Sequence, residues 1–394
     1  MAKTSARSRA SKNSDSKPKV ASRAATTNND YALVGRRITG RFPAPKLPYQ
    51  PRDPKHYKPG IGFIGCGGIS ETHLRAYRAA GYRVVALCDL KEPKAERRRK
   101  EFFPKAALYV DYRELLDRAD IEVIDIATHT IDRPPIVEAA LRAGKHVLSQ
   151  KPFVSDLATG RRLAELARRQ KRLLAVNQNG RWAPHFGYMR EAVWAGLIGE
   201  LTGVNLAVHW DHTWVAGTRF DDMRHLVLND FAIHWLDFLT TCMRERQPRR
   251  VFASIARSAG QVNKAALLGQ VIVEYEDAQA TLCFHGDTKF GPRDESTLVG
   301  THGTIVSSGT SISDQRLRLL TERGEARPTL VGSWFPDGFH GTMAELLSAV
   351  EEGREPMNSA ADNLRSLALC FAAVASAERG KPVVPGSVER LLAQ

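Results

Sequence analysis

Apolar and polar positions alternate in two different ways along the chain, and the change falls near residue 180. Over residues 58–180, short apolar runs alternate with longer stretches whose apolar residues recur at helical spacing. We expect strands at Ile61–Ile64, Arg83–Cys88, Ala107–Val110, Val123–Ala127, His146–Ser149 and Leu173–Asn177. We expect helices at Ile69–Ala80, Pro93–Phe102, Tyr112–Arg118, Pro135–Ala143 and Ser155–Gln170. Strands spaced by helices in this way predict an α/β domain with a parallel sheet and right-handed crossovers.

After about residue 180, strands rich in Val, Ile, Leu and Thr dominate and helical stretches become few. The expected strands are Thr202–Asp211, Val251–Ile255, Leu267–Tyr275, Gln279–His285 and Ser296–Val299. This pattern predicts a large, mainly antiparallel sheet in an α+β domain over residues 181–394. Two late helical stretches, Phe339–Glu352 and Ser359–Arg379, are expected to pack back on the first domain.

Residues 1–57 differ from both domains, and the first thirty of them hold almost no large apolar residues. The first thirty are rich in Ser, Ala, Lys and Arg, which predicts disorder, and six prolines from Pro43 to Pro59 predict an extended strap. Thirteen Lys and Arg against three Asp among residues 1–55 supply +10 of the formal net charge of +14. The folded part is therefore only mildly basic. We interpret the tail as a solvated extension; contact with nucleic acid or an anionic surface, a targeting role and a mis-assigned start are the alternatives.

The overall composition is that of an ordinary globular protein, with 43% hydrophobic and 25% charged residues. No run of about 18 apolar residues is present, and the chain start lacks the apolar stretch of a secretory signal. The five cysteines form no CxxC pair, and a scattered, odd set is typical of a reducing cytosol. These features predict a cytoplasmic protein. The motifs of serine hydrolases and P-loop NTPases are also absent from the sequence.

A glycine-rich turn separates the first expected strand from the first expected helix. It runs from Gly65 to Ser70, with Gly67, Gly68 and Ile69 between them. Glycines at this place let backbone amides and the helix N-terminus approach a pyrophosphate, which a Cβ atom would obstruct. Taken alone, the turn is better explained as a structural connection between strand and helix.

Asp89 changes that interpretation, because it closes the second expected strand about 20–25 residues after the loop. A carboxylate there can bind the adenosine ribose hydroxyls, so the two features together predict a Rossmann domain that binds a nicotinamide dinucleotide. The carboxylate repels a 2′-phosphate and favours NAD, while Lys91 nearby keeps NADP as the alternative.

The segment from His209 to Trp214 is dense in aromatic and imidazole groups. A zinc site is one interpretation, but His209 and His212 would point to opposite faces of a strand, so we expect no metal site. Trp210, His212 and Trp214 would share the other face. They can stack on a sugar ring or on a partner subunit, with plain sheet packing as the alternative.

Three features together resemble the Gfo/Idh/MocA family of sugar oxidoreductases. They are the glycine loop with its acidic partner, a Gln-Lys-Pro tripeptide that begins at Gln150, and a later Asp-x-x-x-His segment. The resemblance covers roughly residues 60–380 and implies a Rossmann domain followed by an α+β domain with a large antiparallel sheet. By this resemblance Lys151, Asp230 and His234 form the catalytic set.

The sequence departs from the family pattern at two positions. Gln150 stands where the family usually has Glu, which removes a carboxylate beside Lys151. His129 replaces the more usual proline after Thr128. We expect Thr128, Gln150 and Lys151 to contact the cofactor. The change at residue 150 alters the acid–base tuning of Lys151, and the change at residue 129 alters contacts on the nicotinamide side.

Oxidising a secondary alcohol requires a hydride acceptor and a base that removes the hydroxyl proton. His234 titrates near neutrality when unperturbed, and Asp230 four residues earlier would share its helical face and orient the imidazole. Lys151, at a strand end, can stabilise the developing alkoxide. Each residue alone has an ordinary structural explanation, and only their combination favours a site. Asp237 faces either solvent or the same pocket.

These features predict an NAD(P)-dependent dehydrogenase acting on a secondary hydroxyl of a sugar, cyclic polyol or glycoside. One alternative is NAD-dependent glycoside cleavage by transient oxidation and elimination, and another is a non-catalytic cofactor-binding sensor or scaffold. Substrate contacts are expected from Arg181, Trp182, His212 and Trp214. The resemblance further implies a homo-oligomer through the antiparallel sheet, where the apolar segments Val271–Val273 and Thr281–Phe284 fit an interface.

Overall fold

The structure is a computed structural model of the chain that describes residues 38–391. The tail that we expect to be disordered falls largely on residues 1–37, which lie outside the described residues. Within residues 38–391 no helix is both long and apolar enough to cross a lipid bilayer.

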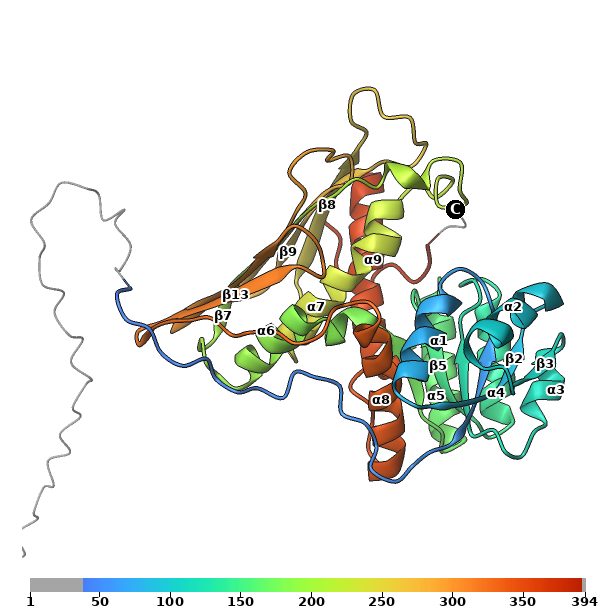
Figure 1. The fold of residues 1–394 in the computed structure, drawn as a ribbon. Helices are drawn as coiled ribbons and strands as arrows, with labels where there is room; N and C mark the ends of the chain where they lie inside the picture. The colour runs from blue at the N-terminus through green and yellow to red at the C-terminus, as the bar shows by residue number, and fades with distance from the viewer. Residues whose placement is uncertain (1–37, 392–394) are drawn as a thin grey trace, which may run out of the picture. The chain divides into compact units, whose positions relative to one another are not determined.

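A six-stranded sheet forms the first half of the described chain, with every neighbouring pair parallel and strand order β3-β2-β1-β4-β5-β6 (Figure 1). Its strands are β1 (Gly60–Ile64), β2 (Arg83–Cys88), β3 (Ala107–Tyr109), β4 (Val123–Ile126), β5 (His146–Gln150) and β6 (Leu174–Asn177). The intervening helices are α1 (Ser70–Ala79), α2 (Glu92–Phe102), α3 (Tyr112–Leu116), α4 (Arg133–Arg142) and α5 (Leu157–Arg169). This is the Rossmann strand order, which confirms the predicted α/β domain.

An eight-stranded sheet forms the second half, in the order β14-β13-β12-β11-β7-β10-β9-β8. Its strands are β7 (Leu201–His209), β8 (Arg250–Ala256), β9 (Leu268–Glu274), β10 (Gln279–His285), β11 (Arg293–Gly300), β12 (Gly303–Gly309), β13 (Gln315–Thr321) and β14 (Gly324–Ala326). The pair β7 and β10 is parallel and the other pairs of this sheet are antiparallel. The mainly antiparallel sheet is thus confirmed, while β12, β13 and β14 are strands that the sequence pattern did not predict.

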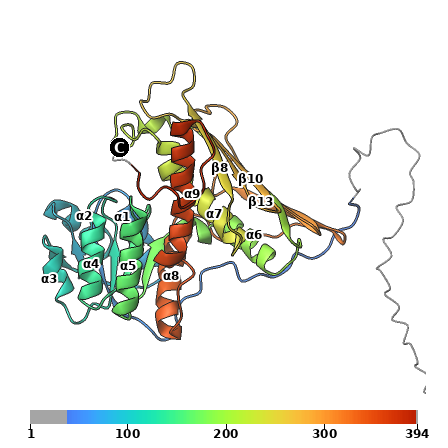
Figure 2. The ribbon, with the colours of Figure 1, turned by 180° about the vertical axis from the view of Figure 1, so that it is seen from behind.

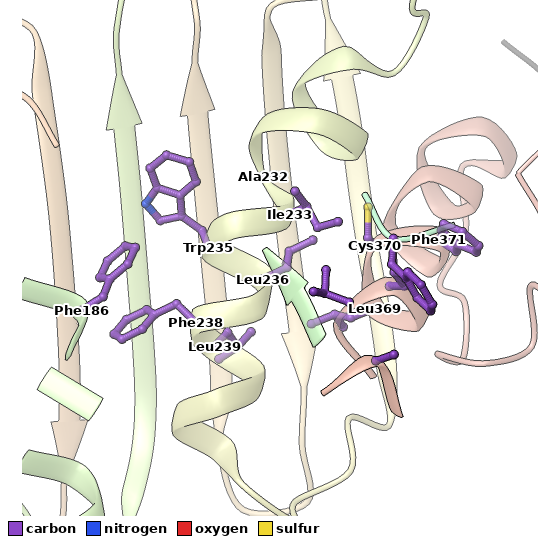
Figure 3. Close-up of a cluster of buried hydrophobic side chains, with 14 of the residues drawn as sticks. Phe186, Ala232, Ile233, Trp235, Leu236, Phe238, Leu239, Leu369, Cys370 and Phe371 are labelled. Atoms are coloured by element: carbon purple, nitrogen blue, oxygen red, sulfur yellow. The ribbon is translucent and has the colours of Figure 1, made fainter. Parts of the chain in front are cut away.

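Three helices lie on one face of the large sheet, as both ribbon views show (Figures 1 and 2). They are α6 (Pro184–Trp194), α7 (Ile233–Met243) and α9 (Ala360–Arg379). Figure 3 shows Phe186 of α6 facing Phe238 of α7, and their rings stack at 4.1 Å with an interplanar angle of 11°. These helices bury the inward side chains of the strands and leave the other face of the sheet without a covering helix in the described chain.

Helix α8 (Asp337–Glu352) returns to the first domain. Its apolar side chains join the core that α1 forms with the parallel sheet. The contributing residues are Phe339, Met343, Leu346 and Leu347 from α8, with Leu74 and Tyr77 from α1.

The proline-rich strap is extended and runs along both halves of the chain. Phe42 N–H donates to the Glu325 carbonyl of β14 at 3.1 Å, and the Pro45 carbonyl accepts from the Tyr188 hydroxyl at 2.8 Å. Further on, the Arg52 carbonyl accepts from Ser348 Oγ of α8 at 2.8 Å. The strap therefore connects the edge of the large sheet with the helix that packs on the parallel sheet.

Candidate active site

The glycine loop combines one glycine that the fold requires with two that leave open space. Gly65 has a φ of +99°, and a Cβ there would lie 2.9 Å from backbone atoms of Ala127 and Thr128. Only glycine suits that turn. A Cβ on Gly67 or Gly68 would meet no atom within 4 Å. The missing side chains at these two positions leave room for a ligand at the N-terminus of α1.

Asp89 lies beside this loop, as the sequence predicts. Its Oδ2 accepts from the Cys66 N–H at 2.8 Å, and its Oδ1 accepts from the Lys91 N–H at 2.8 Å. A carboxylate has about four lone-pair positions, so these two bonds orient Asp89 while leaving acceptor capacity for ribose hydroxyls.

Arg98 of α2 supports the glycine loop, a contact that sequence reasoning missed. Its guanidinium donates to Ser70 Oγ at 3.1 Å and to the carbonyls of Gly67 and Gly68 at 3.5 and 3.4 Å. Arg98 is only 3% exposed although α2 is a highly charged helix, and the pattern alone indicated a solvated surface. Ile69, by contrast, is exposed at the start of α1.

Lys151 and Asp230 meet although 79 positions separate them in the chain. Lys151 directly follows β5, and Asp230 lies in a π-helical turn over Val227–Phe231. The lysine Nζ donates to Asp230 Oδ1 at 3.0 Å and to the Asp230 carbonyl at 2.9 Å. Both side chains are largely buried, so this ion pair is shielded from solvent screening.

His234 is the second residue of α7 and packs edge-on against Trp334, with ring centroids 5.4 Å apart. Its Nδ1 is buried and has no hydrogen-bond partner among the described residues, while the residue as a whole is half-buried. Burial, together with the nearby Lys151 ammonium, holds the pKa of His234 well below 6.5. The imidazole is therefore neutral at pH 7 and able to accept a proton.

The expected orientation of His234 by Asp230 is corrected by the structure. Between residues 38 and 391 no hydrogen bond joins the two side chains, and the Asp230 carboxylate binds Lys151. The π-helical turn that carries Asp230 precedes α7, so the four-residue spacing of a regular helix does not apply there.

Gln150 lies behind Lys151, and its amide binds two groups of the protein. Its Oε1 accepts from the Lys151 N–H at 2.7 Å, and its Nε2 lies 2.9 Å from His73 Nε2. Both ends of the amide thus bind protein groups, and the residue is 6% exposed. Buried His73 of α1 is a second residue that sequence reasoning missed.

Thr128 lies two residues after the end of β4, next to the glycine loop. Its carbonyl accepts from the Arg133 guanidinium at 2.6 Å, while its Oγ1 is buried without a partner among the described residues. The neighbouring His129 contacts Arg219 of the second domain, and burial followed by that guanidinium lowers the pKa of His129. The residue that replaces the family's proline therefore links the two domains beside the site.

Arg181 and Trp182, expected at the substrate, have structural roles instead. The Arg181 guanidinium pairs with Asp237 and Asp362 at 2.7 Å each, and it is almost fully buried. Asp237 is likewise buried, so it faces neither solvent nor a ligand. Trp182 packs on α8 at Gly341, where a Cβ would lie 2.2 Å from the indole. These contacts occupy both side chains within the core.

The aromatic segment after β7 does not continue the strand, because β7 ends at His209. His212 is buried and packs edge-on against Phe231, with ring centroids 4.3 Å apart. Burial lowers the pKa of His212 to about 4. Trp214 lies on a short 3₁₀ turn and is 59% exposed. The expected shared strand face is therefore wrong, and Trp214 alone of these two residues offers an exposed ring.

At the carboxyl edge of the parallel sheet, a dinucleotide cradle thus lies beside a proton-transfer group formed by Lys151, Asp230 and His234. Open space at two loop glycines, a preoriented carboxylate at Asp89 and the α1 N-terminus fit the phosphates and ribose of NAD. Such an arrangement defines an NAD-binding oxidoreductase of the Rossmann class.

Comparison with known families places the chain within that class. Residues 60–178 match the oxidoreductase family with an NAD-binding Rossmann fold, and residues 186–306 match the GFO/IDH/MocA C-terminal domain. The chain belongs to the Gfo/Idh/MocA family of oxidoreductases.

Two curated relatives cover most of the chain. D-apiose dehydrogenase of Paraburkholderia graminis is 27% identical over 83% of this chain and 90% of its own length. Inositol 2-dehydrogenase of Rhizobium meliloti is 26% identical over 80% of this chain and 96% of its own length.

Solved structures share the fold at lower sequence identity. An oxidoreductase from Agrobacterium radiobacter, in complex with NAD+, L-tartaric acid and magnesium, has a TM-score of 0.75 and 22% identity, covering 84% of this chain and 99% of its own. Levoglucosan dehydrogenase in complex with NADH and levoglucosan has a TM-score of 0.72 and 18% identity, covering 84% of this chain and 100% of its own.

Proposed function

We propose that the chain is an NAD-dependent dehydrogenase that oxidises a secondary hydroxyl of a sugar or cyclic polyol. The observation that carries the proposal is the Lys151–Asp230 ion pair at the carboxyl edge of an NAD-binding sheet, with His234 close by. The names of the relatives, which act on D-apiose, inositol and levoglucosan, support this substrate class.

Each member of the group has a distinct task in the proposed reaction. Bound NAD supplies the hydride acceptor. Neutral His234 accepts the hydroxyl proton. The Lys151 ammonium stabilises the alkoxide that develops on the substrate oxygen, and Asp230 holds that ammonium in place through its 3.0 Å contact. The exposed indole of Trp214 supplies a surface on which a sugar ring can stack.

Turnover of a defined substrate panel tests the proposal. Purified full-length protein is mixed with NAD or NADP and with D-apiose, myo-inositol, levoglucosan and simple glycosides, and formation of reduced nicotinamide is followed by absorbance. We expect reduction of NAD with at least one polyol or sugar. Tight NAD binding without turnover on any compound would favour the sensor interpretation. Release of an aglycone at constant NADH would identify redox-neutral cleavage instead.

Assembly and location belong to the same proposal. The uncovered face of the large sheet carries Phe252 and Ile272, which are 43% and 39% exposed, on the neighbouring strands β8 and β9. We expect this face to pair with a second copy of the chain. Val271 and Val273, part of the segment expected at the interface, turn inward and are buried.

All five cysteines are free, which supports a cytoplasmic location.

A further inference from the structure

A buried line of polar side chains runs behind Lys151 through the first domain. Asp125 of β4 is fully buried, and its Oδ2 accepts from the Tyr77 hydroxyl at 2.5 Å and from His73 Nδ1 at 2.7 Å. On the other side of the imidazole, His73 Nε2 lies 2.9 Å from Gln150 Nε2 and 3.0 Å from Asn177 Nδ2. Three strands and α1 thus contribute to one hydrogen-bonded line.

The line defines the tautomer of His73. Amide nitrogens only donate, so His73 Nε2 must accept from both of them, and the imidazole proton must lie on Nδ1. The orientation of the Gln150 amide is set independently of the histidine, because Gln150 Oε1 accepts from the Lys151 N–H at 2.7 Å. Asn177 Oδ1 lies 3.1 Å from Thr342 Oγ1, whose hydroxyl also lies 3.0 Å from the Phe339 carbonyl. His73 is therefore a neutral imidazole that donates to Asp125.

A carboxylate at residue 125 lowers the stability of the fold if it serves packing alone. Its strand neighbours Val123, Ile124 and Ile126 are buried apolar residues, and its Oδ1 has no hydrogen-bond partner among the described residues. The cation that faces it is the buried Arg133, which itself binds backbone carbonyls at the end of β5. The two hydrogen bonds at Oδ2 compensate only part of the desolvation of this carboxylate, because Oδ1 has no partner within the described chain, so a role in the site explains Asp125 better than stability does.

We propose that Asp125 is a positioning residue for Lys151. Its carboxylate fixes the Nδ1–H tautomer of His73, His73 fixes the amide of Gln150, and that amide binds the Lys151 N–H. The backbone orientation so defined directs the ammonium to Asp230 at 3.0 Å. The positioning role rests on the proposed function of Lys151, whereas the tautomer of His73 does not.

Nuclear magnetic resonance of the full-length protein tests the tautomer without any substrate. In ¹⁵N-histidine-labelled protein, His73→Gln identifies the signal of His73 among the twelve histidines. We expect a neutral imidazole with its proton on Nδ1 in the wild type. Moving the carboxylate across the ring, in the double variant Asp125→Asn with Gln150→Glu, is expected to transfer the proton to Nε2. A wild-type proton on Nε2, or an imidazolium, would overturn the proposal.

The backbone of Lys151 can be observed in the same way. Labelling with ¹³C-Gln and ¹⁵N-Lys selects the two Gln-Lys pairs of the sequence, whose amides are those of Lys151 and Lys171. We expect Asp125→Asn to shift the Lys151 amide, with the exposed Lys171 as an unchanged internal control. An unmoved Lys151 amide in Asp125→Asn would contradict the positioning role, whatever activity the protein has.

Kinetics supply the final comparison once the substrate panel has identified a substrate. Asp125→Asn is expected to lower kcat about 10–100-fold with little change in KM, and the double variant to recover most of that loss. Asp120→Asn, an exposed carboxylate on the neighbouring loop, is the matched control and should leave both constants unchanged. Additive losses in the double variant would reduce Asp125 to a purely structural residue. An inactive wild type would count against the proposed function alone.

Discussion

At the scale of single residues, the site depends on contacts between groups far apart in sequence, and Lys151 is the most sensitive of them. Lys151→Met removes the ammonium that pairs with Asp230. We expect kcat to fall about 10²–10³-fold, because the charge on the substrate oxygen loses its stabilising partner. Steady-state kinetics on the substrate from the panel measure the loss. Lys171→Met, the other lysine that follows a glutamine, is the control and should behave as wild type.

The pH dependence of oxidation reports on His234. An imidazole accepts a proton only when it is neutral, so the rate falls as the pH drops through its pKa. Burial and the Lys151 ammonium hold that pKa well below 6.5, which places the acidic limb of the kcat profile below pH 6.5. A profile of kcat against pH provides the measurement. An acidic limb centred above pH 6.5 would show that His234 is not the base.

At the scale of elements, different glycines of the loop serve the stability of the fold and the binding of NAD. Gly65→Ala places a Cβ 2.9 Å from the backbone that follows β4 and forces a residue with a Cβ into a φ of +99°. We expect a loss of stability of about 1–3 kcal/mol, seen as a lower Tm. Gly68→Ala meets no atom within 4 Å and should keep the wild-type Tm while weakening NAD binding at least tenfold, because the Cβ enters the phosphate space. Equal NAD affinity of wild type and Gly68→Ala would contradict the assignment of this loop.

Asp294 makes strand β11 sensitive to pH. Burial, followed by the neighbouring Glu295, raises the pKa of Asp294 to about 7, and neither oxygen has a hydrogen-bond partner among the described residues. The folded pKa lies above the unfolded value of about 4, so the free energy of unfolding falls as pH rises through that interval. We therefore expect Asp294→Asn to raise Tm by about 5 °C at pH 8 and to change it little at pH 4. A stabilisation by Asp294→Asn that is the same at both pH values would contradict the titration.

The elements that the sequence predicts are those with a strong local pattern. All six parallel strands could be predicted because they are short apolar runs between amphipathic helices. Helix α6 could not, since eight of its eleven residues are buried and it therefore lacks a polar face. Strand β12 reads GTIVSSG and resembles a loop until β11 and β13 pair with it on either side. Long-range pairing decides such segments, and a single sequence does not display it.

The candidate site shows the same division. The glycine loop and Asp89 are local signals, and the structure places them side by side. The partners of Arg181 and Lys151 lie 56 and 79 positions away, so spacing gave no indication that one arginine is structural while the lysine meets Asp230. Buried His73 on α1 has no distinguishing pattern either. Its importance depends on which strands lie beneath the helix.

At the scale of the whole molecule, the active site joins two domains that fold around separate sheets. The parallel sheet supplies the dinucleotide cradle and Lys151, while the second domain supplies Asp230 and His234. The Lys151–Asp230 ion pair and the His129–Arg219 contact therefore span the domain boundary. The proton-transfer group is complete only when the two domains are docked, which couples the chemistry to the packing of α8 and the strap on both halves.

The uncovered face of the large sheet leads to the final prediction, which concerns the oligomeric state. In register across this face lie Phe252, Ile272, Thr281 and Asn205, on four neighbouring strands. A broad, partly apolar sheet face of this kind favours pairing with a second copy. We expect light scattering after size exclusion to give a multiple of the 43.6 kDa chain mass. Ile272→Lys should shift the mass to that of a single chain, because it places a charge within the interface.

A matched variant distinguishes loss of this interface from a general effect of added charge. Val262 is 86% exposed in the loop that precedes β9, so Val262→Lys adds the same charge away from the sheet face and should leave the assembly intact. A wild type that elutes as a single chain, or an oligomer that persists in Ile272→Lys, would place the contact elsewhere. Because Lys151, Asp230 and His234 all belong to one chain, a dissociated Ile272→Lys variant should still bind NAD, and retained binding would show that each chain carries its own site.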